Sequence, residues 1–229
     1  MNGLYVTGTD TGVGKTAVAT AIVRHLVRAG LRVGVYKPVA SGTSPDDATS
    51  DAMRLWEAAG RPGTPEAVCP QSFAAPISPP QSARAAGRTV NEQLLRDGCL
   101  VWRDVSDIVI VEGAGGLFSP LGEISLNVDL ARDLDLPLVV VDAACLGAIG
   151  RTLAVVRAAR AEGLRVAAVV MSHTEPSNPE DTATAGPWAI AQESAADVAA
   201  RISPVPVAVL RHGAESIEPK IDWATLARS

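Results

Sequence analysis

The chain has 229 residues, of which 47% are hydrophobic and only 3% aromatic, a composition that suits one domain of alternating helices and buried parallel strands better than a β-sandwich. The formal net charge of −5, without any block of lysine and arginine, argues against a nucleic-acid or anionic-membrane surface, and no apolar run approaches the roughly 18 residues that span a bilayer. Three widely spaced cysteines, with no signal peptide expected before the first strand, indicate a cytoplasmic protein without a disulfide framework.

A strand, a glycine-rich loop and a helix are predicted at the start of the chain. Residues 4–6 form an apolar run, residues 8–16 have the sequence GTDTGVGKT, and residues 17–29 have helical periodicity that ends at Gly30. Glycines let the backbone N–H groups of such a loop turn inward around a phosphate. The helix N-terminus adds unpaired N–H groups and a positive dipole end. Lys15 would reach the terminal phosphates of a nucleotide, and the Thr16 hydroxyl would bind magnesium.

This loop departs at one position from the strict pattern G-x-x-x-x-G-K-[ST]. The pattern requires glycine at position 9, where this chain has Thr9, and Gly8 stands one step earlier. The alternative is a tight turn that only caps the helix, which the strand–loop–helix context disfavours. We therefore predict a nucleotide triphosphate site at this loop.

The next predicted elements surround a polar and proline-rich region. A strand is expected at residues 31–36, ended by Lys37 and Pro38 because proline cannot continue a central ladder. Helices are expected over residues 51–59 and 91–102. Residues 60–80 are rich in proline, and a loop this long inside a compact domain is more often functional than idle.

The second half of the chain alternates strands and helices. Buried strands are expected at residues 107–112, 137–142, 166–171 and 205–210, and helices at residues 148–162 and 185–201. This alternation predicts a doubly wound, mostly parallel α/β sheet with right-handed crossovers. Ligands of such sheets lie beyond the carboxyl ends of the strands, so Glu112, at the end of its strand, is expected beside the phosphate loop.

Two carboxylates are candidate magnesium ligands. Mg²⁺ prefers a few hard oxygen ligands together with waters and phosphate oxygens, which makes Asp51 and Glu112 natural partners of Thr16. Asp51 has a plain alternative as a helix cap, in which case Asp46 or Asp47 would serve instead.

Lys37 and Ser41 have both a functional and an ordinary interpretation. A cation at the end of a strand could neutralise charge that develops during phosphoryl transfer, but a lone lysine is more often solvated surface. Ser41 would be an ordinary loop serine on the same view. The three histidines, His25, His173 and His212, lack zinc-ligand spacing, so no zinc site is predicted.

Five segments of the chain carry a family resemblance. They are VTGTDTGVGKT at residues 6–16, YKPVASG at 36–42, SDA at 50–52, FAAPISP at 73–79 and VEGAGGLFSPL at 111–121. Together, and in this order, they resemble the dethiobiotin synthetases, ATP-dependent carboxylases that close the ureido ring in biotin synthesis. The loop with Gly8 and Thr9 is the one this family uses, so the departure from the strict pattern supports the resemblance.

The resemblance implies a P-loop NTPase-like fold and assigns site residues by position. It assigns ATP and its magnesium to Gly12, Val13, Gly14, Lys15, Thr16, Ala17, Asp51, Glu112, Gly113, Ala114 and Gly115, with Thr16, Asp51 and Glu112 on the metal. It places the nucleobase near Met171, Ser172, Val209, Leu210 and Arg211. It places the diamine substrate near Thr11, Lys37, Ser41, Gly115 and Gly116, with Lys37 and Lys15 as the catalytic cations.

The resemblance also implies a homodimer whose substrate site lies at the subunit interface. Residues 146–150, including Leu146 and Gly147, would come from the partner subunit and receive the carboxylate tail of the substrate, since a helix N-terminus favours an anion. The chain departs from the family at two positions. Met171 stands where the family often has an asparagine that reads the adenine edge, and Gly150 stands where an asparagine can occur at the subunit interface.

The implied reaction is the ATP-dependent carboxylation and ring closure of 7,8-diaminononanoate with CO2 or bicarbonate, which yields dethiobiotin, ADP and phosphate. A partitioning-type P-loop ATPase switch is an alternative, but such proteins carry an additional lysine early in the loop, where this chain has Asp10. A cobyrinate amidating enzyme needs a glutamine amidotransferase domain, for which 229 residues leave no room. A non-enzymatic binding module does not account for a lysine and a carboxylate beside the phosphate loop.

Overall fold

A seven-stranded sheet forms the centre of the molecule in the computed structural model, which describes residues 1–44, 47–176 and 187–228. The strand order is β2-β5-β1-β6-β7-β8-β9, and every neighbouring pair is parallel except β8 with β9. The strands are β1 (Gly3–Gly8), β2 (Val33–Tyr36), β5 (Ile108–Gly116), β6 (Leu138–Ala143), β7 (Val166–Ser172), β8 (Val207–Leu210) and β9 (Ile217–Glu218). The predicted doubly wound, mostly parallel α/β fold is confirmed.

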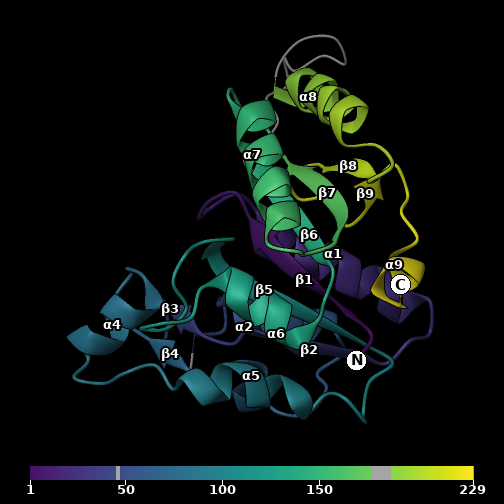
Figure 1. Cartoon of the computed structure of the whole chain (residues 1–229). Helices are drawn as coiled ribbons and strands as arrows, with labels where there is room; N and C mark the ends of the chain where they lie inside the picture. The colour runs from purple at the N-terminus through teal and green to yellow at the C-terminus, as the bar shows by residue number, and fades with distance from the viewer. Residues whose placement is uncertain (45–46, 177–186, 229) are drawn as a thin grey trace.

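Helices cover both faces of this sheet (Figure 1). Helices α6 and α7 lie on the near side of the sheet in that view, and α1 and α2 lie behind it. The helices are α1 (Lys15–Arg28), α2 (Asp51–Ala58), α3 (Pro65–Val68), α4 (Pro79–Ala85), α5 (Glu92–Leu100), α6 (Asn127–Leu134), α7 (Ala148–Ala161), α8 (Pro187–Ile202) and α9 (Trp223–Arg228). Since both faces are covered, the central strands are near-continuous apolar runs, as in other parallel sheets.

The segment 60–80 is not one long loop, as the sequence suggested. It contains α3, the short strand β4 (Ser72–Phe73) and the start of α4, and β4 pairs in parallel with β3 (Ala40–Ser41) as a separate two-stranded sheet. Thr64 caps α3 by accepting a hydrogen bond from the backbone of Ala67, and a proline follows at the first helical position. Elements this short carry no hydrophobic period, so pattern analysis cannot distinguish them from a loop.

Three further elements were not predicted, namely α6, α9 and the antiparallel edge strand β9. The predicted helix at 185–201 corresponds to α8, but its expected first residue, Ala185, lies outside the described residues. Within the described ranges, no helix is long and apolar enough to cross a membrane.

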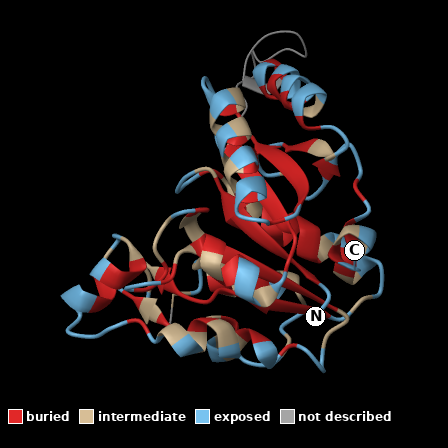
Figure 2. Ribbon diagram, in the orientation of Figure 1, coloured by how far each residue is buried: buried red, intermediate tan, exposed pale blue. Residues whose placement is uncertain are grey.

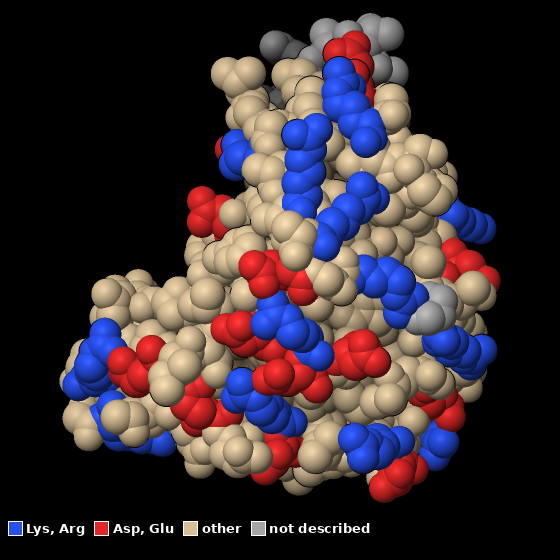
Figure 3. Space-filling view, in the orientation of Figure 1, with Lys and Arg blue, Asp and Glu red and all other residues tan. Residues whose placement is uncertain are grey.

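The core lies between the sheet and its helices (Figure 2). All residues of β1, β2 and β7 are buried, and one continuous cluster of buried apolar side chains joins the strands to the helices. On the face shown in Figure 3, basic and acidic side chains alternate over the lower half of the molecule.

The order of the strands positions the candidate site. β1 lies between β5 and β6, with Val6 paired to Glu112 and Gly8 paired to Gly116. Because parallel strands end at the same edge of the sheet, the loop after β1 and the end of β5 lie side by side.

Candidate active site

The glycine-rich loop joins the end of β1 to the first residue of α1. Gly12 and Gly14 have φ values of 76° and 91°, in the left-handed region that favours glycine. Gly14 is the N-cap of α1, and no side chain caps this helix. The first N–H groups of α1 therefore remain available to an anion.

Lys15 folds back over this loop, and its Nζ donates to the Asp10 carbonyl oxygen at 2.8 Å. Burial and the nearby charge of Lys37 lower the pKa of Lys15 to about 8. Among the residues that the structure describes, no carboxylate forms an ion pair with this buried cation, which an anionic phosphate would complement.

Thr9, the residue that departs from the strict loop pattern, has a structural role. Its hydroxyl donates to Asp142 Oδ1 at 2.6 Å, and its backbone N–H donates to the Val141 carbonyl. Asp142 is fully buried at the end of β6 and also accepts hydrogen bonds from Arg151 and Thr152 of α7. The threonine therefore ties the loop to β6 and α7, which a glycine at this position could not do.

A cluster of charged and hydroxyl groups lies next to the loop. Lys37 Nζ is 2.5 Å from Glu112 Oε1, 3.2 Å from Asp51 Oδ2 and 3.1 Å from the Gly113 carbonyl oxygen. Thr16 donates its hydroxyl hydrogen to Glu112 Oε1 at 2.8 Å. The predicted residues Thr16, Lys37, Asp51 and Glu112 are therefore brought together, although 96 positions separate Thr16 from Glu112.

Burial makes the charges of this cluster interdependent. Lys37 is 3% exposed and Glu112 is fully buried, whereas the side chain of Asp51 is 46% exposed. Burial by itself lowers the pKa of Lys37, but the carboxylates of Glu112 and Asp51 outweigh it and raise the pKa above its ordinary value. Burial likewise raises the pKa of Asp51, but the charge of Lys37 and hydrogen bonds lower it overall. Lys37 is consequently held as a cation beside the phosphate loop.

The cluster has the donor chemistry that suits Mg²⁺. Within the described residues, Oε2 of Glu112 is buried and has no hydrogen-bond partner. The Thr16 hydroxyl contacts Oε1 of the same carboxylate, and Asp51 shares the Lys37 ammonium with it. No group of three or more His, Cys, Asp or Glu side chains that could hold a metal occurs in the described part of the chain. A pair of carboxylates and one hydroxyl is the set that Mg²⁺ uses when phosphates and waters complete its shell.

A cavity of about 720 Å³ extends from this cluster. The predicted residues that line it are Thr11, Gly12, Gly14, Lys15, Thr16, Ala17, Lys37, Ser41, Asp51, Ala114 and Gly115. Residues 76–79 line it as well, so part of the proline-rich segment lies at the site. Val13, Glu112, Gly113 and Gly116 are buried against it and do not line it.

The alternatives to Asp51 differ in position. Asp47 lines the cavity, but its carboxylate accepts hydrogen bonds from Thr49 and Thr43. Asp46 lies outside the described residues. Asp51 contacts Lys37 directly while it also occupies the first turn of α2, whose N-cap is Ser50.

Asn127, which the sequence analysis missed, holds the glycine-rich end of β5. Its Nδ2 donates to the carbonyl oxygens of Ala114, Gly116 and Ser119 at 2.7, 2.9 and 3.0 Å. Its Oδ1 accepts from the Tyr5 hydroxyl at 2.9 Å. One buried amide thus fixes the loop that forms a wall of the cavity, and no motif in the sequence indicates this residue.

A second cavity, of about 440 Å³, also borders the phosphate loop. Ser172, Leu210 and Arg211, which the resemblance assigns to the nucleobase, line this cavity, and Gly12, Gly14 and Ala17 line both cavities. Met171 and Val209 do not line this cavity. Met171 is fully buried with its sulfur 3.9 Å from the Thr152 hydroxyl of α7, and Val209 lines a groove beside α8. The alternation of side chains along a strand places them on the opposite face from their neighbours.

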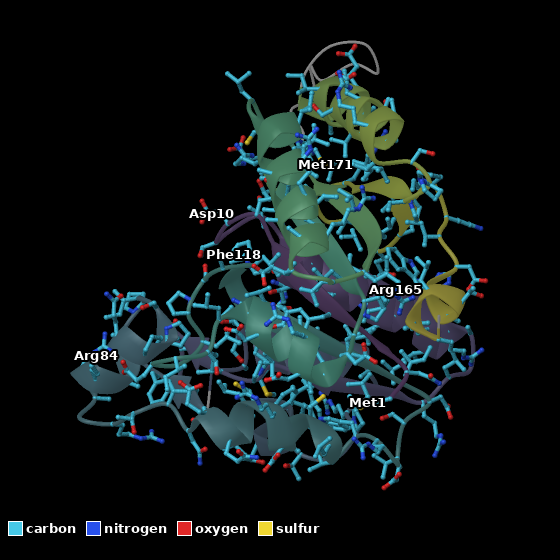
Figure 4. All side chains as sticks on the ribbon, viewed as in Figure 1. Met1, Asp10, Arg84, Phe118, Arg165 and Met171 are labelled. Atoms are coloured by element: carbon cyan, nitrogen blue, oxygen red, sulfur yellow. The ribbon has the colours of Figure 1, made fainter. Side chains whose placement is uncertain are left out.

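The start of α7 does not reach the cavities of its own chain. Leu146 is 97% exposed, and Gly147 is the N-cap of α7 with a φ of 88°. Neither residue lines the two cavities. In the view of Figure 4, Asp10 of the phosphate loop and Phe118, which follows β5, both appear at the same edge of the molecule.

Comparison with known proteins identifies the family. A family model described as an AAA domain matches residues 2–209. A relative from Rhodopirellula baltica, named ATP-dependent dethiobiotin synthetase BioD, is 42% identical over 194 residues, which are 79% of this chain and 76% of the relative. Proteins of the same name from Anaeromyxobacter dehalogenans and Bacillus cereus are 44% identical over 178 residues and 40% identical over 172 residues. These two alignments cover 78% and 75% of this chain and 79% and 71% of the relatives.

A solved structure supports the fold alone. The cell division protein FtsY from Thermotoga maritima matches 98% of this chain and 66% of its own, with a TM-score of 0.54 at 16% identity. The identity to the synthetases is far higher and extends over most of both chains, so the chain belongs to the dethiobiotin synthetase family.

Proposed function

We propose that this protein catalyses the ATP-dependent carboxylation and ring closure of 7,8-diaminononanoate to dethiobiotin. The observation that carries the proposal is that Lys15, Lys37, Thr16 and Asp51 line one cavity of about 720 Å³, and that buried Glu112 contacts Lys37 and Thr16 from behind them. Ser41 and Gly115 line the same cavity, and its volume supports the binding of a small polar substrate beside the phosphates.

The reaction proceeds through a carbamate. One amine of the substrate attacks CO2 and loses a proton, and a carbamate oxygen then attacks the γ-phosphorus while ADP leaves. The second amine attacks the carbonyl carbon of the resulting carbamic–phosphoric anhydride and loses a proton. The bond from that carbon to the phosphate oxygen breaks, and phosphate departs with the electron pair.

The protein positions these groups and stabilises charge, because phosphoryl transfer needs little covalent help. Lys15 would contact the terminal phosphate, and Lys37 would lie between the phosphate and the carbamate. Thr11, Ser41 and the backbone of Gly115 would orient the diamine. No side chain acts as a nucleophile in this scheme.

Thr16, Asp51 and Glu112 would hold Mg²⁺, as the unpartnered oxygen of Glu112 supports. The ion would neutralise the charge of the phosphate oxygens. Asp51 and Glu112 also hold Lys37 in place, so the same carboxylates orient the cation and the metal.

We further propose that the chain acts as one domain and as a homodimer, with residues 146–150 of each subunit completing the substrate site of the other. The nearly complete exposure of Leu146 and the uncapped N-terminus of α7 support this arrangement. Light scattering is expected to give twice the chain mass, and Leu146→Asp to shift the protein toward monomer and raise the KM for the diamine. A wild-type monomer with full activity would contradict the dimer. The cytoplasmic location stays a prediction.

Dependence of ADP formation on the diamine tests the function. With ATP, magnesium and bicarbonate present, ADP release is expected to be low without 7,8-diaminononanoate and to rise by at least about tenfold when it is added, because the carbamate is the nucleophile. Product mass should match the cyclic urea. ADP release at an unchanged rate with and without the diamine would refute the proposal and favour a nucleotide-driven switch.

A further inference from the structure

Two buried polar side chains without partners line the second cavity. His173 follows β7 and is 4% exposed, and Thr20 of α1 is 6% exposed. Within the described residues, neither ring nitrogen of His173 has a hydrogen-bond partner, and neither does the Thr20 hydroxyl. Both residues line the cavity of about 440 Å³ beside the phosphate loop.

Such groups require an explanation, since a buried polar atom that makes no hydrogen bond destabilises a folded protein. His173 contributes two such atoms at once, and no residue of the phosphate cluster uses it. A ligand that enters the cavity and carries hydrogen-bonding groups would satisfy both side chains.

The position of the cavity indicates what this ligand is. Ala17, Thr20, Ala21 and Arg24 form one side of α1 and line the cavity along its length. The phosphate loop, with Gly12 and Gly14, lines this cavity and the larger one alike. A nucleotide whose phosphates bind to the loop can therefore place its nucleoside here, and this step rests on the proposed use of ATP.

Ser172 is less suited to bind the base than its neighbour. A Cβ atom added to Gly14 would lie 2.2 Å from the Ser172 hydroxyl oxygen, so this hydroxyl lies directly against the backbone of the phosphate loop. His173 is the next residue, and its side chain lines the cavity while both ring nitrogens lack a partner within the described residues.

We propose that His173 is a specificity-determining residue that hydrogen-bonds the edge of the adenine base. A neutral imidazole has one N–H donor and one acceptor nitrogen. The edge of adenine likewise presents an amino donor beside a ring acceptor nitrogen. Because the two ring nitrogens point in divergent directions, one of them pairs with a donor or an acceptor on the adenine edge, and this contact adds affinity that depends on the base.

Calorimetry with nucleotides that lack single base atoms tests this assignment. The ligands are ATP, purine riboside triphosphate without the 6-amino group, 7-deaza-ATP, and inorganic tripolyphosphate without any base. His173→Phe keeps an aromatic ring but removes both nitrogens. It is expected to weaken ATP binding by about tenfold, the size of one good hydrogen bond, and to leave tripolyphosphate binding unchanged.

The analogues isolate the contact itself. Wild-type protein is expected to prefer ATP over at least one of the two analogues, and His173→Phe to remove that preference. His173→Asn, which keeps a donor and an acceptor, is expected to restore part of it. His25→Phe is the matched control, because His25 is exposed on α1 and does not line the cavity.

Two results would overturn the proposal. One is an unchanged ATP affinity and an unchanged preference among the analogues in His173→Phe. The other is an equal loss of affinity for every ligand, tripolyphosphate included, which would indicate a structural role. Both readouts measure nucleotide binding without the diamine, so they fail or succeed independently of the reaction proposed for the site.

Discussion

Replacing Lys37 by alanine is expected to lower kcat by at least about a hundredfold, the loss found when one electrostatic contact to a transition state is removed. The cation is 3% exposed and is held by two carboxylates beside the phosphate loop, where the low dielectric strengthens its action on developing charge. The KM for ATP should change less than kcat, because Lys15 and the loop backbone still bind the phosphates. Steady-state ADP release with saturating diamine measures both constants.

Stability must be separated from catalysis in this experiment. Removing Lys37 leaves Glu112 buried without its cation, which typically destabilises by about 3–5 kcal/mol. A double variant, Lys37→Met with Glu112→Gln, removes both charges and should recover thermal stability without recovering turnover. Lys220→Ala is the matched control at an exposed lysine far along the chain. Near-normal turnover of folded Lys37→Ala protein would contradict the assigned role.

Replacing Glu112 by glutamine is expected to raise the magnesium concentration for half-maximal activity by at least about tenfold. The change removes a fully buried charge whose Oε2 has no partner and whose Oε1 accepts from both Thr16 and Lys37. A carboxylate binds Mg²⁺ far better than a neutral amide does, because the attraction scales with charge. Magnesium titrations of both activity and ADP binding measure the shift.

Two aspartates serve as comparisons for that variant. Asp51→Asn should shift the magnesium requirement in the same direction, since Asp51 contacts Lys37 on the same side of the cluster. Asp47→Asn should have little effect, because the Asp47 carboxylate is engaged by Thr49 and Thr43. An unchanged magnesium dependence in Glu112→Gln would remove this residue from the metal site.

The roles of Asp51, Lys37 and Ser41 show where analysis of single residues is insufficient. From residue type and position alone, each had an ordinary alternative as a cap, a surface lysine or a loop serine. The family resemblance selected the functional alternative, and the fold places all three along one cavity. Their catalytic roles stay predictions until the variants are measured.

For the nucleobase, the tertiary structure suggested a candidate residue that neither sequence analysis nor the family resemblance had selected. A loose alignment nominated Met171 and Val209, and the pleat of β7 and β8 directs their side chains away from the cavity. His173 carried no motif and was considered only as a zinc ligand. His173 became a candidate because its ring nitrogens are buried without hydrogen-bond partners among the described residues. This property depends on tertiary packing and cannot be predicted from a sequence pattern.

The sequence by itself determined the alternation of strands and helices, the phosphate loop and the strand-end carboxylate, because these follow from hydrophobic period and from local backbone chemistry. Only the tertiary structure decided that Asp142 holds Thr9, that Asn127 holds the end of β5, and that Lys37 is bound by two carboxylates. These contacts join residues from 13 to 133 positions apart. The order of the strands determines which residues become neighbours. Burial then requires each polar group to form a hydrogen bond with a neighbour that the fold provides.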